Sequence, residues 1–469
     1  MKVLLINKYY YLRGGSERYF FDLKNLLENN GHTVIPFSMK HEKNERSKYD
    51  KYFSDRVEFE TSPSPSLIKI GINGFKIFYN RDAVQKLEKL IRDEKPDIAH
   101  LHNIAHQLSP GIISVLKKNN IPIVQTMHDY KLICPAYLLF NGNNECRACS
   151  GGKYYNCFFK KCVKKSWLKS FIVMCEAYLH NQILKTYGKV DLFIAPTGFV
   201  KDACVEAGVS EAKIRVVRGF LNLEIRNKSV KESCRDGGLP RLEDKESCRD
   251  GALPRLEDKE SCRDGALPRL EEDEEDENQK SEIDDYLLYF GRLSVEKGVY
   301  VLLDAMSKMD KKLKLKIVGD GPEFFNLKSK IKNLKLEDNA EVLGYMQGRE
   351  LQEIIQESNA VIVPSICPES MCYSLLEAMS LGKIVIASRI GGMRDFINDG
   401  KNGFLFKPGD SGDLAKKLNL LFCPKESDPF LALTPLDISD ISRRARVCVS
   451  ELTPERHYEE IMRIYNRLT

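Results

Sequence analysis

The stretch PESMCYSLLEAMSLGKIVIASRIGG, from Pro368 to Gly392, carries the pattern that decides the fold. It places Glu369 just before a helical stretch, Glu377 inside that stretch, and then the apolar run KIVIAS and two glycines. A helix followed directly by a buried apolar strand is one unit of a parallel α/β sheet. The stretch therefore predicts an α/β fold, with one acid in a loop after a strand and the other on the helix.

Similar apolar runs recur on both sides of this stretch. In the first half they are VLLI, TVIPFSM, DIAHLHN, IPIVQTMHDY, DLFIAP and IRVVRGF, and in the second half YLLYFGRLS, LKLKIVGDGP, AEVLGYM, NAVIVPSICPES, KIVIASRIGG and NGFLFKPGD. Helical stretches lie between several of them, as in a doubly wound sheet. We predict two Rossmann-like domains that face each other across a cleft, at residues 1–227 and 285–440. The final segment, 441–469, ends in the amphipathic stretch PERHYEEIMRIYNRL, which must pack onto a domain, with the first domain as one option.

A repeat separates the two halves. KESCRDGGLPRLED begins at Lys231, and closely similar copies begin at Lys245 and Lys259, followed by the acidic run DEEDENQKSEIDD. A charged repeat of this length, with Gly and Pro and without apolar periodicity, builds no core. We predict that residues 228–284 form a disordered linker insertion, and a partner-binding arm remains the alternative.

Composition limits the class of protein. The chain has 469 residues and a formal net charge of +5, so bulk charge does not favour a nucleic-acid partner. The start, MKVLLINKYY, has an apolar run too short for a signal peptide, and no stretch approaches the roughly twenty apolar residues of a membrane span. We expect a cytoplasmic protein, and peripheral association with the inner face of the membrane stays open.

Cysteines gather in one loop of the first half. The spacing gives C-x2-C and then C-x4-C, with one more thiol upstream; the residues are Cys134, Cys146, Cys149, Cys157 and Cys162. A structural zinc site is one interpretation, and reduced structural thiols are the other.

Ligands of parallel sheets bind at the carboxyl ends of the strands, so the residues that follow the strands are the candidates for chemistry. The helix after Glu369 offers unpaired backbone N–H groups to a phosphate. Glu377, further along that helix, is placed to accept the two hydroxyls of a ribose, and Glu369 to meet what lies beyond the phosphates. The alternative is a helix-terminal acid and a surface acid without a ligand.

The loop GRLSVEKG offers Arg292 and Lys297, which together suit a diphosphate leaving group. A solvated helix start is the alternative for this pair. In GDGP, Asp320 either caps the next helix or belongs to a bare turn, and we favour the turn.

In the first half, Gly14 and Gly15 permit close approach of the backbone to a ligand, although a full G-x-G-x-x-G is absent. His128 ends a predicted strand and is placed to bond a substrate hydroxyl. A structural histidine with satisfied hydrogen bonds is the default for His128, and equally for His100 and His102.

Taken together, these motifs resemble one known family. GGSE, HD, GRLSVEKG, GDGP, PESMCYSLLEAMSLGKIVIAS, GG and DGKNGFLF stand in the order and spacing of the retaining glycosyltransferases of family four. The resemblance covers nearly the whole chain apart from the repeat insertion, and it implies a two-domain GT-B fold.

The resemblance also implies roles for individual residues. Arg292 and Lys297 would bind the diphosphate of a nucleotide-sugar and stabilise it as it leaves. Glu369 would contact the donor sugar, Glu377 the ribose, and His128 the sugar from the first domain. The implied catalytic residues are thus Glu369, His128, Arg292 and Lys297. No cofactor and no catalytic metal are implied, because the cationic side chains neutralise the leaving group.

Three further positions follow from the same resemblance. Gly15 would line the donor cleft, and the helix-start amides of Met371 and Cys372 would hold the phosphates. The family commonly has an aromatic residue and a glycine after the first acid, whereas this chain has Ser370, Met371 and Cys372. This departure leaves the identity of the donor open.

The function implied is a hexosyltransferase reaction, with retention, from a nucleotide diphosphate sugar to a glycan or lipid-linked acceptor in cell-surface polysaccharide synthesis. A nucleotide-sugar epimerase and a non-catalytic nucleotide-sugar-binding protein are the alternatives. Lysines and aromatic residues alternate in the stretch FFKKCVKKSWLKSFIVM, which suits an anionic membrane surface or, equally, a packed helix with a solvated basic face.

Overall fold

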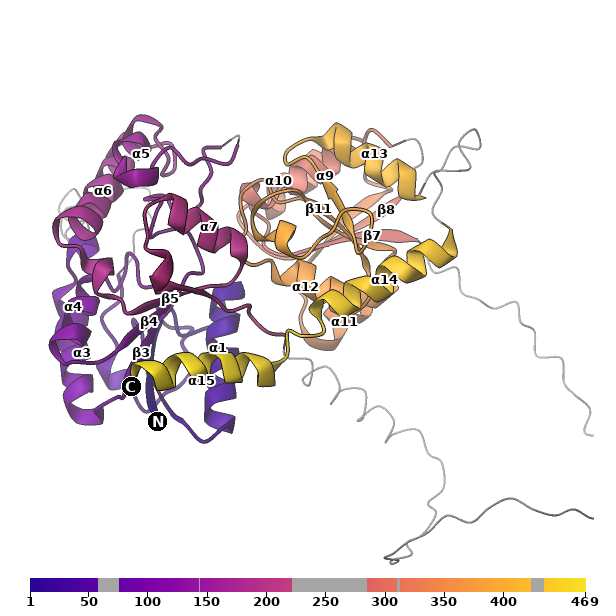
Figure 1. Ribbon diagram of the computed structural model, residues 1–469. Coiled ribbons are helices and arrows are strands. Elements are labelled where there is room, and N and C mark those ends of the chain that lie inside the picture. Colours follow the sequence, from indigo (N-terminus) through magenta and orange to yellow (C-terminus); the bar gives the residue numbers. More distant parts are fainter. Residues whose placement is uncertain (58–75, 143, 222–284, 310–312, 423–433) are drawn as a thin grey trace, which may run out of the picture. The chain divides into compact units, whose positions relative to one another are not determined.

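The computed structural model describes residues 1–57, 76–142, 144–221, 285–309, 313–422 and 434–469. These residues belong to one compact unit, Met1–Leu223 with Asp285–Thr469, which contains two parallel sheets (Figure 1). The predicted insertion at 228–284 lies outside the described residues.

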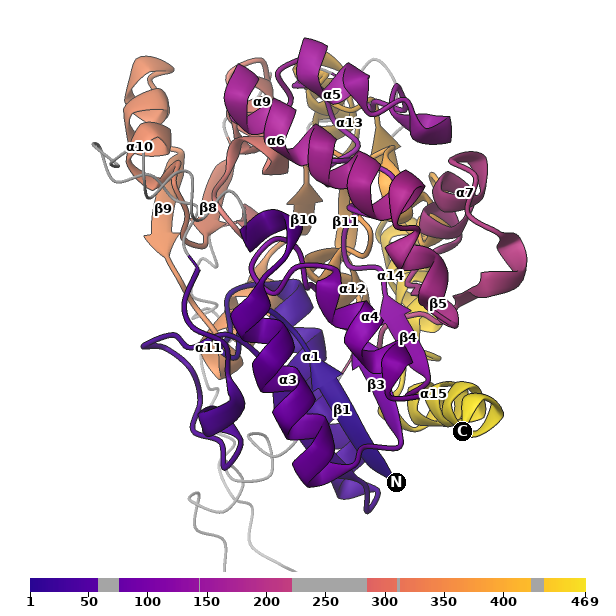
Figure 2. The ribbon, with the colours of Figure 1, turned by 90° about the vertical axis from the view of Figure 1, so that its left-hand side faces the viewer.

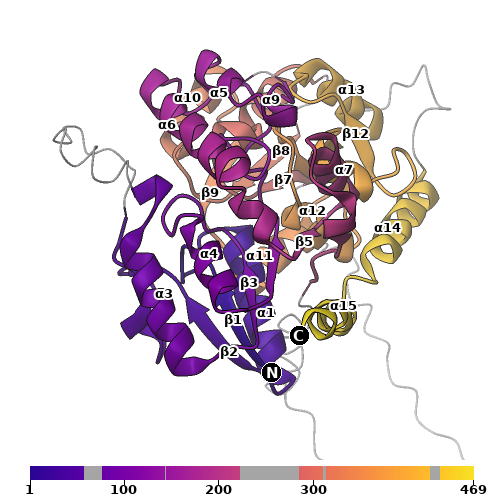
Figure 3. The same ribbon diagram turned by 60° about the vertical axis from the view of Figure 1, so that its left-hand side comes forward.

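The first sheet has six parallel strands in the order β2-β1-β3-β4-β5-β6. Figure 3 labels β1, β2, β3 and β5 of this sheet. Their bounds are β1 Lys2–Ile6, β2 Thr33–Phe37, β3 Ile98–Leu101, β4 Ile123–Thr126, β5 Leu192–Ala195 and β6 Ile214–Val216. The longer helices of this part are α1 Gly15–Asn29, α3 Arg81–Glu94, α4 Gly111–Lys118, α5 Tyr155–Phe159, α6 Trp167–Ala177 and α7 Gly198–Glu206, and a π-helical turn, η3 Tyr178–Ile183, continues α6. Short 3-10 turns are η1 Asp50–Tyr52, η2 Ser150–Gly152, η4 Thr186–Lys189 and η5 Glu211–Lys213.

The second sheet also has six parallel strands, in the order β12-β11-β10-β7-β8-β9. Their bounds are β7 Tyr286–Phe290, β8 Lys314–Val318, β9 Ala340–Gly344, β10 Ala360–Val363, β11 Ile384–Ser388 and β12 Phe404–Phe406. Its helices are α9 Val299–Met306, α10 Phe324–Asn333, α11 Gly348–Glu357, α12 Tyr373–Ser380, α13 Ser411–Phe422 and α14 Pro435–Val449, with 3-10 turns η6 Val295–Lys297 and η7 Gly391–Asp395. Two parallel six-stranded sheets covered by helices confirm the predicted α/β fold class.

Alternation along the strands explains why helices cover both faces of the second sheet. Leu287 and Tyr289 of β7 belong to a core with α9, α10 and α13, whereas Leu288 and Phe290 belong to a second core with α11, α12 and α14. Successive side chains of a strand point to opposite faces, so a strand that is apolar throughout needs a helical layer on each side. Figure 1 shows these two groups of helices on either side of β7 and β8.

The last helix, α15 (Pro454–Leu468), returns to the first sheet. It begins and ends where the amphipathic stretch predicts, and it lies beside α1 (Figure 1). Ile461 and Tyr465 are fully buried in the core of the first sheet, and the Tyr465 hydroxyl bonds Nδ1 of His100 at 2.7 Å. A residue at position 465 thus completes a core that begins with β1.

Among the described residues, no helix combines the length and apolar composition needed to cross a membrane.

Candidate functional site

The loops after β7 and β8 pack directly against each other. Leu293 N–H donates to the Asp320 carbonyl at 2.9 Å, and Glu323 N–H donates to the Leu293 carbonyl at 3.1 Å. A Cβ atom at Gly321 would lie 2.2 Å from the Leu293 carbonyl oxygen. Glycine at this position of GDGP is therefore required by the approach of GRLS. The Asp320 side chain accepts from Gly321 N–H and does not cap α10, whose N-cap is Glu323, so the turn interpretation is confirmed.

The same loop is fixed against the end of β10, which positions Lys297. Gly298 has a left-handed φ of 73°, and a Cβ atom there would lie 1.8 Å from the Pro364 carbonyl oxygen. Ile366 N–H donates to the Glu296 carbonyl at 3.0 Å. The chain can pass so close to β10 only because residue 298 has no side chain.

Lys297 and Glu369 form an ion pair at this junction. Lys297 Nζ donates to Glu369 Oε1 at 2.6 Å, and Ser365 Oγ donates to the same oxygen at 2.7 Å. Burial lowers the pKa of Lys297, but the Glu369 carboxylate, with smaller contributions from Cys372 and Tyr289, raises it, so the net pKa is raised and the ammonium stays charged. The structure thus joins two residues that the sequence predicts for the site.

The two glycines at the end of the opening stretch hold the Glu369 backbone. Gly392 N–H donates to the Glu369 carbonyl at 2.8 Å. Gly391 has a φ of 60°, and a Cβ atom there would lie 2.4 Å from Glu369 N. The pair therefore lets the turn after β11 lie against the loop that carries the acid.

Helix α12 begins at Tyr373, three residues later than the predicted start at Ser370. Ser370 Oγ donates to the His128 carbonyl at 2.6 Å, and Thr197 Oγ1 donates to the Ser370 carbonyl at 3.0 Å. These bonds to residues of the first sheet's half hold Ser370 outside the helix. Of the two predicted phosphate-binding amides, Cys372 is the N-cap and Met371 precedes it.

Glu377 lies in the second turn of α12, where its side chain is 4% exposed. The guanidinium of Arg18, on α1, pairs with its carboxylate. Burial lowers the pKa of Arg18, but Glu377 and Asp22 raise it, so the net pKa is raised. Sequence reasoning did not single out Arg18. The only local signal was a basic residue three positions after Gly15.

Gly15 lies at the start of α1 and against Tyr373. A Cβ atom at Gly15 would lie 3.1 Å from the Tyr373 ring. At Gly219, after β6, a Cβ atom would lie 2.7 Å from Met371 Sδ and 2.8 Å from the Tyr373 hydroxyl. Two glycines from the first half thus contact the segment that opens α12, and the role of Gly15 toward a donor stays a prediction.

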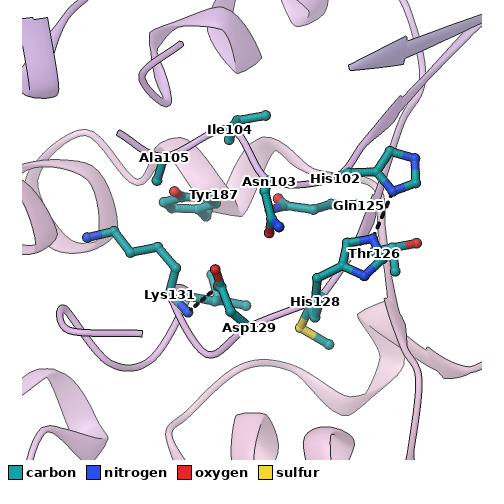
Figure 4. A pocket seen from close by; sticks show the side chains of 12 residues that line it. His102, Asn103, Ile104, Ala105, Gln125, Thr126, His128, Asp129, Lys131 and Tyr187 are labelled. Atoms are coloured by element: carbon teal, nitrogen blue, oxygen red, sulfur yellow. Dashed lines mark hydrogen bonds between the residues drawn. The ribbon is translucent and has the colours of Figure 1, made fainter. Parts of the chain in front are cut away.

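Three histidines lie at the carboxyl ends of β3 and β4. Both ring nitrogens of His100 are bonded, Nδ1 to Tyr465 and Nε2 to Thr126 Oγ1 at 2.7 Å, so the structural interpretation holds for His100. His102 Nδ1 and His128 Nε2 lie 2.9 Å apart (Figure 4). Burial lowers the pKa of His100 and of His128 to about 3, so both rings are neutral.

A small cavity is lined by both histidines of this pair and by Asp129, the residue after His128. His102, Gln125, Asp129 and Lys131 are among its lining residues (Figure 4). His102 Nε2 and Gln125 Oε1 are buried and have no hydrogen-bond partner among the described residues, and burial raises the pKa of Asp129. Polar atoms left unpaired at the end of a parallel sheet are a candidate substrate contact.

The contacts place the predicted residues in three groups. Lys297 pairs with Glu369, Glu377 pairs with Arg18, and the His128 backbone is tied to Ser370. The Arg292 side chain is exposed, and its backbone carbonyl accepts from the Tyr289 hydroxyl at 2.8 Å. The ligand roles of all these residues stay predictions.

The cysteine loop contains a pair of interacting thiols. Cys162 N–H donates to the Cys157 carbonyl at 3.1 Å. The hydrogen bond between the two side chains lowers the pKa of Cys162 to about 7 and raises that of Cys157. Within the described ranges, no group of three or more His, Cys, Asp or Glu side chains has an arrangement that holds a metal ion, so the zinc interpretation gains no support.

Two family models match the chain. Glycosyl transferases group 1 matches residues 271–427, and Glycosyltransferase Family 4 matches residues 13–225. The first contains the Lys297 loop and the Glu369–Glu377 stretch, and the second contains Gly15, Arg18 and His128.

Among curated relatives, an uncharacterized 42.6 kDa protein in the cps region of Klebsiella pneumoniae is 25% identical over 84% of this chain and 87% of its own length. A lipopolysaccharide 1,2-N-acetylglucosaminetransferase of Salmonella typhimurium is 32% identical over 30% of this chain and 40% of its own length. The match with sulfoquinovosyl transferase SQD2 of Arabidopsis thaliana, 35% identical, likewise spans only 27% of that protein and 30% of this chain.

Solved structures share the fold at low sequence identity. Anabaena Alr3699/HepE, in a complex with UDP-glucose, has a TM-score of 0.57 and 16% identity, with both chains covered completely. The two parallel sheets, the contacts among the motif loops and both family models agree on the fold and the family. The chain therefore belongs to the group 1 glycosyltransferases of the family-4 type and has the two-domain GT-B fold.

Proposed function

We propose that the protein is a retaining glycosyltransferase that moves a sugar from a nucleotide diphosphate donor to a glycan or lipid-linked acceptor in cell-surface polysaccharide synthesis. One observation carries the proposal: the two acids of one loop and helix, Glu369 and Glu377, are each held by a cation, Lys297 and Arg18. Charges of both signs at the carboxyl end of a parallel sheet suit a ligand with phosphates at its centre and hydroxyls on both sides.

In this proposal the leaving diphosphate is stabilised by positive charge. Lys297 supplies a partly buried ammonium, and Arg292 supplies an exposed guanidinium from the same loop. The first turn of α12 adds backbone N–H groups, with Met371 and Cys372 leading into it. These groups act as the sugar–phosphate bond breaks, when charge develops on the departing oxygen.

The two acids orient the rest of the donor. Glu377, nearly buried in α12, accepts hydrogen bonds from the ribose hydroxyls once Arg18 releases it. Glu369, at the loop, contacts the donor sugar. His128 approaches the sugar from the first sheet's half as a neutral ring, which bonds a hydroxyl without competing for the diphosphate. Gly15 leaves room for the donor beside α1.

The comparisons support a sugar nucleotide and a surface-glycan acceptor. The Anabaena structure holds UDP-glucose, and the Salmonella relative is named for lipopolysaccharide. We therefore propose a UDP-sugar as the first donor to test. We further propose that residues 1–227 serve the acceptor, that residues 285–440 bind the donor, and that the protein acts in the cytoplasm at the inner face of the membrane.

The test is a screen of the purified chain against UDP-glucose and other nucleotide-sugars, read as release of nucleotide diphosphate with and without glycan acceptors. We expect slow donor hydrolysis alone and faster release with the right acceptor. Release that needs no acceptor and accompanies inversion at a sugar carbon would instead indicate an epimerase.

Variants localise the activity to the proposed site. Lys297→Gln and Glu369→Gln should each lower turnover about 100-fold or more, because the first removes a positive charge from the departing diphosphate and the second removes the carboxylate that holds Lys297 and contacts the donor sugar. The matched control is Lys330→Gln, which breaks a 2.8 Å pair between α10 and Asp304 of α9 and should leave turnover unchanged. Full activity of the Lys297 variant would contradict the proposal.

A further inference from the structure

Helix α6 buries two polar residues and exposes three large apolar ones, although Val173 and Ala177 of its inner face are buried as well. Ser170 and Glu176 are 0% and 1% exposed, whereas Trp167, Leu168 and Phe171 are 46%, 58% and 47% exposed. A helix on the surface of a soluble protein normally shows the reverse pattern. The outward apolar face therefore needs an explanation other than packing in the core.

Exposed apolar side chains concentrate around this helix. Seven of the seventeen large apolar residues that are exposed in the described part of the chain lie within 30 positions. They are Tyr155, Phe159, Trp167, Leu168, Phe171, Ile183 and Leu184. Large exposed apolar patches mark sites of interaction with a protein or a membrane.

Aromatic contacts hold the patch in place. The Phe158 ring lies 4.7 Å from Trp167, 5.8 Å from Phe171 and 5.4 Å from Phe159, measured between ring centroids. The ammonium of Lys161 lies 4.6 Å from the centroid of the Trp167 ring. The rings thus form one preformed cluster on α5 and α6.

The charge around the cluster has a single sign. No acid occurs from Cys146 to Cys175, and the next one, Glu176, is buried against Lys131 Nζ at 2.5 Å. The lysines of this stretch are Lys153, Lys160, Lys161, Lys164, Lys165 and Lys169. In Figures 1 and 2, α5 and α6 lie on the outside of the first sheet's half, and no labelled helix covers α6.

We propose that this surface, the basic-aromatic surface formed by α5, α6 and η3, docks onto an anionic lipid bilayer. Aromatic and leucine side chains would enter the headgroup region, and the lysines would lie against the negatively charged headgroups. Charge of one sign favours a lipid surface over a protein partner, whose interface normally carries few lysines. The inference deepens the proposed function, since a lipid-linked acceptor lies in such a bilayer.

Vesicle co-sedimentation of the full chain tests this docking. Vesicles of phosphatidylcholine alone are compared with vesicles that also contain phosphatidylglycerol. We expect binding to the anionic vesicles only, and weaker binding as salt concentration rises. No binding to the anionic vesicles, or equal binding to both kinds, would overturn the proposal.

Variants that remove exposed apolar side chains test whether vesicle binding depends on this surface. The double variant Phe159→Ser/Leu168→Ser should lose vesicle binding by at least about tenfold, since it removes the most exposed apolar groups of α5 and α6. The matched control is Phe325→Ser/Tyr345→Ser, whose side chains are 78% and 68% exposed on the second sheet's half and should bind as the wild type does. Equal loss in both double variants would overturn the assignment to α5 and α6.

Charge variants provide a second measurement. Lys164→Gln and Lys165→Gln should each weaken binding about fivefold, which corresponds to about 1 kcal/mol per lysine. Lys332→Gln and Lys335→Gln, which alter exposed lysines near α10, are the controls. UDP binding is measured in parallel. If the wild type does not bind UDP, this counts against the proposed function alone. If the lysine and apolar variants lose self-association and not vesicle binding, the membrane proposal is overturned.

Discussion

Arg18 of α1 and Glu377 of α12 form an ion pair between the halves of the chain that carry the first and second sheets. The carboxylate that we assign to the ribose is thus paired with a guanidinium. Arg18 also lies 3.8 Å from Asp22, one turn along α1, which offers the guanidinium a second partner. Under the proposed function, Glu377 would exchange Arg18 for the ribose hydroxyls when a donor binds.

Replacing Arg18 with Ala should therefore tighten UDP binding. The Arg18 side chain is 40% exposed, so its pair with Glu377 is worth about 1 kcal/mol at most, and we expect up to about a fivefold lower Kd by calorimetry. Arg56→Ala, which breaks an exposed pair with Glu42, is the control. Weaker binding in the Arg18 variant would instead make Arg18 a direct contact of the nucleotide.

Gly298→Ala should destabilise the protein strongly. Its Cβ atom would overlap the Pro364 carbonyl in addition to the strain of a positive φ. Gly400→Ala is a control with the strain alone, because φ is 76° there and no atom lies within 4 Å of the added Cβ. In urea unfolding we expect a loss of about 1 kcal/mol for position 400 and about 3 kcal/mol or more for position 298. Equal losses would mean that the loop shifts freely away from β10.

Stability should fall between about pH 6.5 and pH 4 because of buried histidines. Burial lowers the pKa of His457 to about 4, although its bond to the Arg218 carbonyl raises it slightly, and the pKa values of His100 and His128 are lowered to about 3. The unfolded chain binds protons at these rings first, so their stabilising contribution is present above pH 6.5 and is lost as pH falls. From pH 7 to pH 5, urea unfolding should show a loss of about 1–2 kcal/mol per histidine.

A variant of His457 tests how much this histidine contributes to the dependence of stability on pH. His457 bonds the Tyr19 hydroxyl at 2.9 Å and the Arg218 carbonyl at 2.8 Å, and His457→Gln should be less stable at pH 7 but less sensitive to acid. His41→Gln, on a partly exposed histidine, is the control. An unchanged pH slope in the His457 variant would contradict the assignment.

Cys162 should be the most reactive thiol among the described cysteines. Its bond with Cys157 lowers its pKa to about 7, and its side chain is partly exposed, whereas burial raises the pKa of Cys149 to about 12. Alkylation by iodoacetamide, followed by mass spectrometry, should be fastest at Cys162 and should rise as pH increases through about 7. Cys157→Ala, which removes the hydrogen-bond partner, should slow the reaction of Cys162 at pH 7 and below. A faster reaction at Cys175 would contradict the prediction.

The periodicity of the sequence sufficed for most of the fold. Apolar runs located the strands of both sheets, and the stripe in PERHYEEIMRIYNRL gave α15 its bounds. These features are local: a strand covered on both faces is apolar throughout, and a helix packed on one side has an apolar stripe. The start of α12 at Tyr373 was missed because bonds from Ser370 to the first half decide it.

The candidate site was predictable only where its contacts are local. The loop glycines pointed to close approaches, and the structure identifies what approaches them, as with Gly391 against Glu369. Arg18 was not found, because its partner lies 359 positions away and no pattern in α1 distinguishes it from a surface arginine. The unpaired Nε2 of His102 likewise depends on the packing of β3 against its neighbours.

The return of α15 has a consequence for how the chain matures. Ile461 and Tyr465 close a core whose first strand is β1, so that core stays open while the intervening residues are synthesised. During translation, the first half would leave exposed the apolar residues that α15 covers, whereas the last helix that covers the second sheet, α14, ends at Val449. Because the last helix completes the core of the first sheet, we expect the amino-terminal half to need chaperone protection until synthesis is complete.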